Sequence, residues 1–205
     1  MIKNIIFDLG NVIINYNPEQ IADSFTNKED EKKYIFDEIF YAPEWALMNL
    51  GNITNDEAIE IINKRNDFKY ETLTQEFLHE WYKRQPINSD IVEIAKILKS
   101  NGYNLFVLSN MANQTYEYFK NDDFFSLCTG IVISAHEHVK KPDEKVYRLL
   151  LERYNLNAEE CLFIDDDVSR KNYETANKVG IKGRRIMPNQ AEDIKKLLLE
   201  FNINI

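Results

Sequence analysis

Aspartates follow short apolar stretches at two distant points of the chain. Asp8 comes directly after Ile5-Ile6-Phe7, and the triplet Asp165-Asp166-Asp167 comes directly after Cys161-Leu162-Phe163-Ile164. Short apolar runs are typical of buried strands, and in an open α/β sheet the ligand crevice lies at the carboxyl ends of the strands. We therefore interpret Asp8 as the first candidate for chemistry. The alternative is an aspartate that only caps the following turn.

Hydrogen-bond donors follow two further apolar stretches. Ser109 and Asn110 come after Leu105-Phe106-Val107-Leu108, and Lys141 comes a few residues after Ile131-Val132-Ile133. Hydroxyl and ammonium groups on neighbouring loops suit the oxygens of a phosphate. Each residue also has a structural interpretation, because Ser109 can cap the next helix and Lys141 can be a solvated surface charge.

The carboxylates predict a metal ion. Asp8, Asp165 and Asp166 would repel one another at one edge of a sheet unless a cation lay among them. Oxygen ligands with no His or Cys nearby suit Mg²⁺ better than zinc. A nucleophile, a hard cation and phosphate-binding groups together describe phosphoryl transfer.

The pattern around these residues predicts an α/β fold. Short strands alternate with helices after about residue 86, which implies a parallel sheet covered on both faces. Residues 17–86 carry only helical signals, such as the capping box Thr54-Asn55-Asp56-Glu57. We therefore predict a Rossmann-like parallel sheet core, residues 1–16 and 87–205, with an inserted all-α helical cap, residues 17–86. An insertion at the carboxyl end of a strand lies over the ligand crevice.

Composition narrows the class of partner. The net charge of −9 argues against nucleic acid or an anionic membrane as the partner, and no stretch approaches the length of a membrane span. Cys128 and Cys161 form no CxxC motif and are interpreted as reduced thiols, which fits a cytoplasmic protein. The expected partner is a small phosphorylated metabolite. Trp45 and Trp81 stay open between a role in the cap core, in substrate binding and in contact with a partner.

The strand-end motifs, in this order, resemble those of the haloacid dehalogenase-like (HAD) hydrolase superfamily. Phe7-Asp8-Leu9-Gly10-Asn11-Val12 resembles its first motif, Leu108-Ser109-Asn110 the second, Lys141-Pro142-Asp143 the third and Phe163-Ile164-Asp165-Asp166 the fourth. The helical block resembles the type-1 α-helical cap of that superfamily. The sequence of the first motif most resembles those of the bacterial glucose-1-phosphate phosphatases and the phosphatase domain of soluble epoxide hydrolase.

The resemblance implies a metal site and a nucleophile. Asp8 would attack phosphorus and form an aspartyl-phosphate. Asp166 would hold Mg²⁺ together with Asp8 and the backbone carbonyl of Gly10, and Asp165 would support the metal.

The resemblance also implies which residues bind the substrate. Ser109, Asn110 and Lys141 would hold the phosphate oxygens, Lys141 would balance the charge of Asp8, and Asn11 is expected to bind substrate. The implied enzyme is a Mg²⁺-dependent phosphoric monoester hydrolase, with a sugar phosphate as the favoured substrate.

The chain departs from the family pattern at three places. Gly10 stands where phosphatases of the superfamily usually carry a second Asp, which acts as general acid and base. His138 replaces the glycine that usually precedes the third motif. The segment Asp167 to Asn172 is about two residues longer than usual, so it stays open whether Asn172 reaches the metal site. Tyr16, Glu44 and His138 are the side chains that we consider as replacements for the missing proton shuttle.

Gly10 has a consequence for the substrate. Loss of a general acid removes a factor of roughly 10²–10⁴ in rate, and the loss matters least when the leaving oxygen is already a fair leaving group. Sugar 1-phosphates and aryl phosphates are therefore expected to react better than phosphates of ordinary alcohols. The alternatives are a degenerate protein that binds phosphorylated ligands without hydrolysing them, and a haloacid dehalogenase in which Asp8 attacks carbon.

Overall fold

A parallel sheet forms the centre of the molecule. The structure is a computed structural model that describes residues 1–169 and 171–205. In this part of the chain, the sheet has five strands in the order β3-β2-β1-β4-β5. The strands are β1 (Asn4–Phe7), β2 (Asn104–Ser109), β3 (Gly130–Ile133), β4 (Cys161–Asp165) and β5 (Lys182–Arg185). The central position of β1 explains its apolar run Ile5-Ile6-Phe7, because both faces of the strand are covered.

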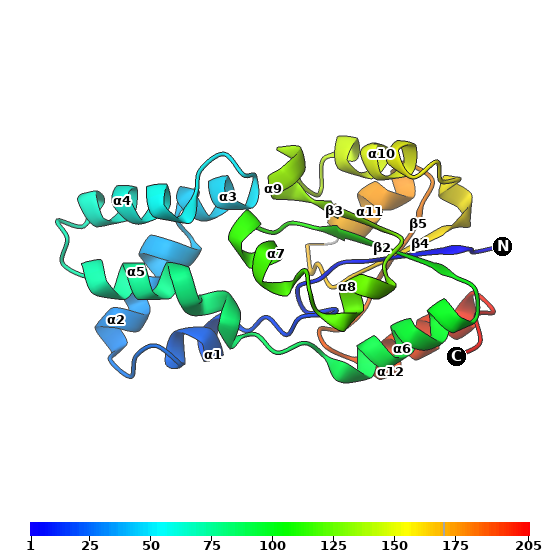
Figure 1. Ribbon diagram of the computed structural model, residues 1–205, viewed down its shortest axis with the longest axis horizontal. Coiled ribbons are helices and arrows are strands. Elements are labelled where there is room, and N and C mark those ends of the chain that lie inside the picture. The colour runs from blue at the N-terminus through cyan, green and yellow to red at the C-terminus, as the bar shows by residue number, and fades with distance from the viewer. Residues whose placement is uncertain (170) are drawn as a thin grey trace.

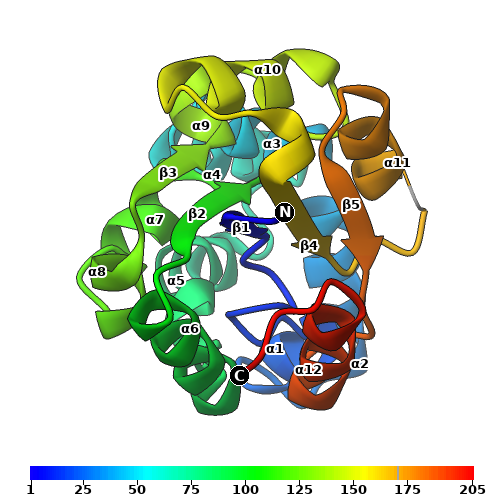
Figure 2. The same cartoon turned by 90° about the vertical axis from the view of Figure 1, so that its right-hand side faces the viewer.

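Helices cover both faces of this sheet (Figure 2). Ile5 and Phe7 pack on one face with apolar residues of α6 (Ser89–Ser100), α8 (Asp123–Leu127) and α12 (Ala191–Glu200). Ile6 packs on the other face with residues of α10 (Glu144–Arg153) and α11 (Lys171–Lys178). Successive side chains of a strand point to opposite faces, so β1 contributes to both clusters. The predicted α/β fold with a parallel sheet is confirmed.

The segment between β1 and α6 is helical, as predicted, and its helices lie together at one end of the molecule (Figure 1). They are α1 (Pro18–Asp23), α2 (Glu29–Tyr34), a π-helix (Ile35–Phe40), α3 (Pro43–Asn49), α4 (Asn55–Arg65), α5 (Glu71–Glu80) and a 3₁₀ helix (Trp81–Arg84). Thr54 and Glu57 form the expected capping box, because each side chain accepts from the backbone N–H of the other residue. We propose residues 17–86 as the cap.

Two chain segments connect this helical cap to the sheet, and they pair with each other. Ile14 and Ile87 form an antiparallel bridge. The Asn15 N–H donates to the Pro86 carbonyl at 2.9 Å, and the Asn88 N–H donates to the Ile13 carbonyl at 2.8 Å. The chain therefore enters and leaves the cap at one place, beside the carboxyl end of β1.

Some local features differ from the predictions. Between β2 and α10 the chain forms α7 (Asn113–Phe119) and the short helices α8 and α9 (Ser134–Glu137); α8 and α9 carry no sequence signal, because four or five residues are too few to show a helical period. The helical block predicted at 17–86 ends in a 3₁₀ turn, Trp81–Arg84, and not in an α-helix. Among the described helices, none combines the length and the apolar character that crossing a membrane requires.

Candidate active site

The sheet brings the predicted carboxylates together. Phe7 and Ile164 are register partners in neighbouring parallel strands, so the residues that follow them, Asp8 and Asp165, lie side by side. One carboxylate oxygen from each of Asp8, Asp165 and Asp166 lies within 4.8 Å of the others. Oδ1 of Asp8 accepts a hydrogen bond from the Leu9 N–H at 2.7 Å, which is a local turn contact, while its Oδ2 faces this cluster.

Lys141 lies inside the carboxylate cluster and is fully buried. Its Nζ is 2.9 Å from Oδ2 of Asp8 and 2.7 Å from Oδ2 of Asp165. The side chain of Asn110 holds the backbone of Lys141 from both sides: its Oδ1 accepts from the Lys141 N–H at 2.8 Å, and its Nδ2 donates to the Lys141 carbonyl at 3.0 Å. The interpretation of Lys141 as a solvated charge is wrong.

The charges in this cluster do not balance without a cation. Three carboxylates and one ammonium leave a formal charge of minus two. The pKa of Asp8 is raised to about 7: burial is the largest cause, Lys141 opposes it, and the charges of Asp165 and Asp166 add to the rise. Burial also raises the pKa of Asp166. Burial alone would lower the pKa of Lys141, but Asp165 and Asp8 raise it above its ordinary value. A hard divalent cation among these oxygens would offset the remaining charge, so the residues fit the predicted Mg²⁺.

Asn172 reaches this cluster in spite of the longer segment that precedes it. Its Nδ2 donates to Oδ1 and Oδ2 of Asp165, at 3.3 and 3.1 Å. Asp167 has a local role, because its carboxylate accepts from the N–H groups of Ser169 and Asn172 and so shapes the turn. The turn interpretation is therefore right for Asp167. Arg170, which belongs to this segment, lies outside the described residues.

Asn11 holds the loop that follows the nucleophile candidate. Its backbone is left-handed, with φ of 55°. Its Oδ1 accepts from the Tyr16 N–H at 3.0 Å and from Nδ2 of Asn189 at 3.2 Å. The side-chain oxygen thus ties the loop to the start of the cap and to the C-terminal part of the chain. The substrate contact expected of Asn11 stays a prediction.

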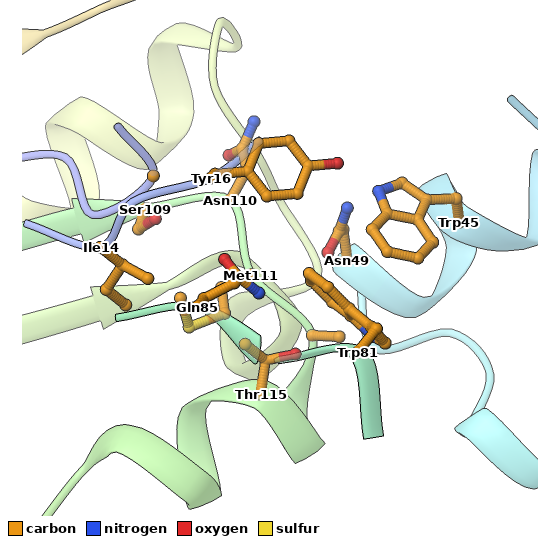
Figure 3. A pocket seen from close by; sticks show the side chains of 12 residues that line it. Ile14, Tyr16, Trp45, Asn49, Trp81, Gln85, Ser109, Asn110, Met111 and Thr115 are labelled. Atoms are coloured by element: carbon orange, nitrogen blue, oxygen red, sulfur yellow. The ribbon is translucent and has the colours of Figure 1, made fainter. Parts of the chain in front are cut away.

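A cavity of about 150 Å³ lies between the strand ends and the cap (Figure 3). The predicted residues Gly10, Ser109 and Asn110 line it from the core. The structure places Trp45 and Trp81 in its wall, with ring centroids 4.7 Å apart. The remaining lining residues are Ile14, Tyr16, Asn49, Gln85, Met111, Ala112 and Thr115.

Several of these lining residues were not found from the sequence. For Gln85 the sequence offers one indication of a site, namely its position next to Pro86, where the helical block ends. Asn49 and Thr115 lie within helices and had none. Ser109 is buried at the end of β2 and does not cap α7, whose N-cap residue is Ala112.

The three side chains considered as replacements for the proton shuttle have different surroundings. Tyr16 lines the cavity, and burial raises the pKa of its hydroxyl, which makes it a weaker acid. Oε1 of Glu44 accepts from Nη1 of Arg65 at 2.9 Å, in the cap. His138 has a left-handed backbone, with φ of 53°, which is a conformation that the glycine usual at this position adopts easily. Its Nδ1 lies 2.9 Å from the backbone carbonyl of Leu50 in the cap. Of the three, Tyr16 alone lines this cavity.

Comparison with known proteins gives one family model and several similar proteins. The family model described as haloacid dehalogenase-like hydrolase matches residues 2–179. A protein of Aspergillus oryzae named sesquiterpene phosphatase astK is 24% identical over 182 residues, which cover 88% of each chain. A drimenol cyclase of Aspergillus calidoustus, drtB, is 23% identical over 97% of this chain, which spans only 36% of that protein's length.

Solved structures share the fold. A HAD-like family hydrolase from Porphyromonas gingivalis superposes with a TM-score of 0.78 at 20% identity, and 100% of each chain is covered. The HAD family enzyme BT-2542 from Bacteroides thetaiotaomicron, in complex with magnesium and inorganic phosphate, gives a TM-score of 0.77 at 19% identity, with 93% of this chain and 96% of that chain covered. L-2-haloacid dehalogenase from Xanthobacter autotrophicus gives 0.64 at 16% identity, with 100% and 85% covered.

These findings agree with the site. The family model covers all the strand-end motifs, and three of these motifs bring their carboxylates and a lysine together in one group. The chain belongs to the haloacid dehalogenase-like hydrolase family.

Proposed function

We propose that this protein is a Mg²⁺-dependent phosphatase that hydrolyses a small phosphorylated metabolite through an aspartyl-phosphate on Asp8. The observation that carries the proposal is the buried contact of 2.9 Å between Lys141 and Asp8 inside the acidic cluster. A buried carboxylate beside an ammonium is suited to attack an anionic phosphate without repelling it, and Gly10, two residues after Asp8, lines the cavity. The relative named as a phosphatase and the neighbour crystallised with magnesium and phosphate support this choice.

The reaction has two displacement steps at phosphorus. A carboxylate oxygen of Asp8 attacks phosphorus, and the bond between phosphorus and the leaving alcohol oxygen breaks with its electron pair on that oxygen. Water then attacks the phosphorus of the aspartyl-phosphate, which releases inorganic phosphate and restores Asp8. Ser109 and Lys141 donate to the phosphate oxygens during both steps.

The metal would be held by Asp8, Asp166 and the backbone carbonyl of Gly10, with Asp165 in support. When bound, Mg²⁺ supplies positive charge that offsets the charge on the phosphoryl oxygens. Asn172 and Lys141 keep the Asp165 carboxylate in place through its two oxygens.

The leaving alcohol takes its proton from solvent in this scheme, because Gly10 provides no acid. Substrates with a more acidic leaving hydroxyl are therefore favoured, and sugar 1-phosphates and aryl phosphates are the two classes of this kind that we propose. The relative named as a sesquiterpene phosphatase supports a second candidate, the phosphate of an apolar alcohol.

The test is phosphate release from a panel of phosphorylated metabolites, with Mg²⁺ and with a chelator. Asp8→Asn is expected to abolish release, and Mg²⁺ is expected to be required. Asp122→Asn is a matched control, because Asp122 caps α8 and Asn is an equally good N-cap residue.

Two outcomes would replace the proposal. Metal-independent chloride release from 2-chloropropionate, lost in Asp8→Asn, would identify a dehalogenase. Mg²⁺-dependent binding of phosphate without turnover of any phosphate ester would identify the non-hydrolytic protein that Gly10 makes possible.

A further inference from the structure

The cavity beside Asp8 has two different ends. Ser109 and Asn110 face it from the core, where the phosphate would lie. Trp45 and Trp81 form the wall on the side away from Ser109 (Figure 3), and Ile14, Met111 and Ala112 are further apolar residues of the lining. The organic part of a bound phosphate ester must lie against this wall.

Gln85 lines the cavity and carries an unpaired donor. The residue is 7% exposed, and its Nε2 has no hydrogen-bond partner among the described residues. Of the lining side chains in the described part of the chain, Gln85 alone contributes a buried nitrogen or oxygen atom that lacks a partner. Buried amides are nearly always hydrogen-bonded, because an unmade bond is unfavourable in an apolar setting.

The position of Gln85 suits a role in recognition. It lies next to Pro86, whose carbonyl pairs with Asn15 where the two connections to the cap run side by side. Figure 3 shows its amide among the side chains that line the cavity. An amide on such a fixed segment can form a hydrogen bond with one atom of a ligand that binds between the cap and the core.

The volume and the lining of the cavity favour a small, apolar ligand group. A cavity of about 150 Å³ admits a group the size of benzene. A sugar carries hydroxyl groups all round its ring, and those facing Trp45, Trp81 and Met111 would lose their hydrogen bonds to water without replacement. An apolar ring with one oxygen atom would leave no such group unpaired.

We propose that Gln85 is a specificity-determining residue, which donates a hydrogen bond from its side-chain amide to an acceptor oxygen on an apolar, ring-sized leaving group of the substrate. The proposal rests on the proposed function, because it assumes that the phosphate of the substrate lies at Ser109 and Asn110. It chooses the aryl-like class of phosphate ester over the sugar 1-phosphates.

Binding of phosphonates tests this proposal separately from catalysis, because their C–P bond is not hydrolysed. The probes are benzylphosphonate and its 2-, 3- and 4-methoxy derivatives, measured by calorimetry with Mg²⁺ present. The proteins are the wild type, Gln85→Met, which keeps the side-chain length and removes the donor, and Gln75→Met, the same change on the exposed surface of α5.

At least one methoxy derivative is expected to bind the wild type and Gln75→Met roughly tenfold more tightly than benzylphosphonate does, which corresponds to one buried hydrogen bond. Gln85→Met is expected to abolish this difference while its affinity for benzylphosphonate changes less than about twofold.

Three results would overturn the proposal. They are a methoxy preference that persists in Gln85→Met, the absence of any methoxy preference in the wild type, and tighter binding of a glucose 1-phosphonate than of every benzylphosphonate. If the phosphonates bind as expected but no phosphate ester is hydrolysed, the proposed function fails and the recognition by Gln85 stands.

Discussion

The ammonium of Lys141 lies 2.9 Å from the carboxylate of Asp8, and both side chains are buried at the edge of the sheet. Their elements are far apart in the chain, since Asp8 follows β1 and Lys141 lies between α9 and α10. The side-chain amide of Asn110 fixes the backbone of Lys141 through two hydrogen bonds. Lys141 and Asp8 therefore neutralise each other only in the folded protein, where the sheet and Asn110 bring them together.

Removal of the Lys141 ammonium is expected to destabilise the protein strongly. Lys141→Met leaves Asp8 and Asp165 buried without their cationic partner, and breaking a buried ion pair in this way costs roughly 3–5 kcal/mol. Urea denaturation in the presence of a chelator measures this free energy of unfolding. Lys3→Met is the control, because Lys3 pairs with Glu160 at the surface, where a salt bridge is worth about 0–1 kcal/mol. Equal effects of the two substitutions would contradict the role given to Lys141.

The raised pKa of Asp8 predicts a pH dependence of stability without metal. The ordinary pKa of 3.8 rises to about 7 in the folded protein, so between these values the folded state binds more protons than the unfolded state. The contribution of Asp8 is therefore most favourable below pH 4 and is lost as the pH rises through about 7.

Thermal unfolding of the wild type and Asp8→Asn at pH 5, 6, 7 and 8, with a chelator, checks this direction. The stability of Asp8→Asn relative to the wild type is expected to increase with pH. Added Mg²⁺ is expected to stabilise the wild type more at pH 8 than at pH 5, because the ionised carboxylate is the metal ligand. A constant difference between the two proteins across this range would show that the pKa of Asp8 is not raised.

Gly10→Asp is expected to add the missing acid. A Cβ atom built on Gly10 has no described atom within 4 Å, so the site has room for a side chain. The rate with glucose 6-phosphate is expected to rise, by up to roughly 10²–10⁴-fold, and much more than the rate with glucose 1-phosphate. Gly10→Asn is the matched control, since it has the same size and no carboxylic acid. Equal rates for the Asp and Asn variants would exclude proton transfer as the cause.

Gly51→Ala is expected to disturb the contact between the cap and the core. Gly51 has φ of +66°, and an added Cβ would lie 2.1 Å from the backbone oxygen of Ala135 at the start of the core helix α9. Gly102→Ala is the control, because Gly102 has φ of +88° and no described atom within 4 Å of the added Cβ.

The control isolates the conformational strain, which is roughly 1–2 kcal/mol for a left-handed residue with a side chain. Gly51→Ala is expected to lower the free energy of unfolding by more than Gly102→Ala, and to lower the phosphatase rate as well. Urea denaturation and phosphate release measure both effects. A smaller loss of stability in Gly51→Ala than in Gly102→Ala would mean that the cap does not press on α9.

The sequence alone determined the elements and the ends at which chemistry would occur. Apolar runs such as Ile5-Ile6-Phe7 predict buried strands, and residues such as Asn17 and Thr54 predict helix starts, because both signals act over a few neighbouring residues. The order of strands and helices then requires a parallel sheet, and parallel strands place their carboxyl ends on one edge. Asp8, Ser109, Lys141 and Asp165 could be proposed together for this reason.

Only the tertiary structure decided how these residues share their contacts. The amide of Asn110 was expected at the phosphate and is engaged by the backbone of Lys141, while Asn172 reaches Asp165 from a segment whose length left this open. Gln85 carries no motif, and its unpaired amide has meaning only where the cap and the core enclose a cavity. Such contacts join residues distant in the chain, so their distances depend on how the elements pack and no local pattern encodes them.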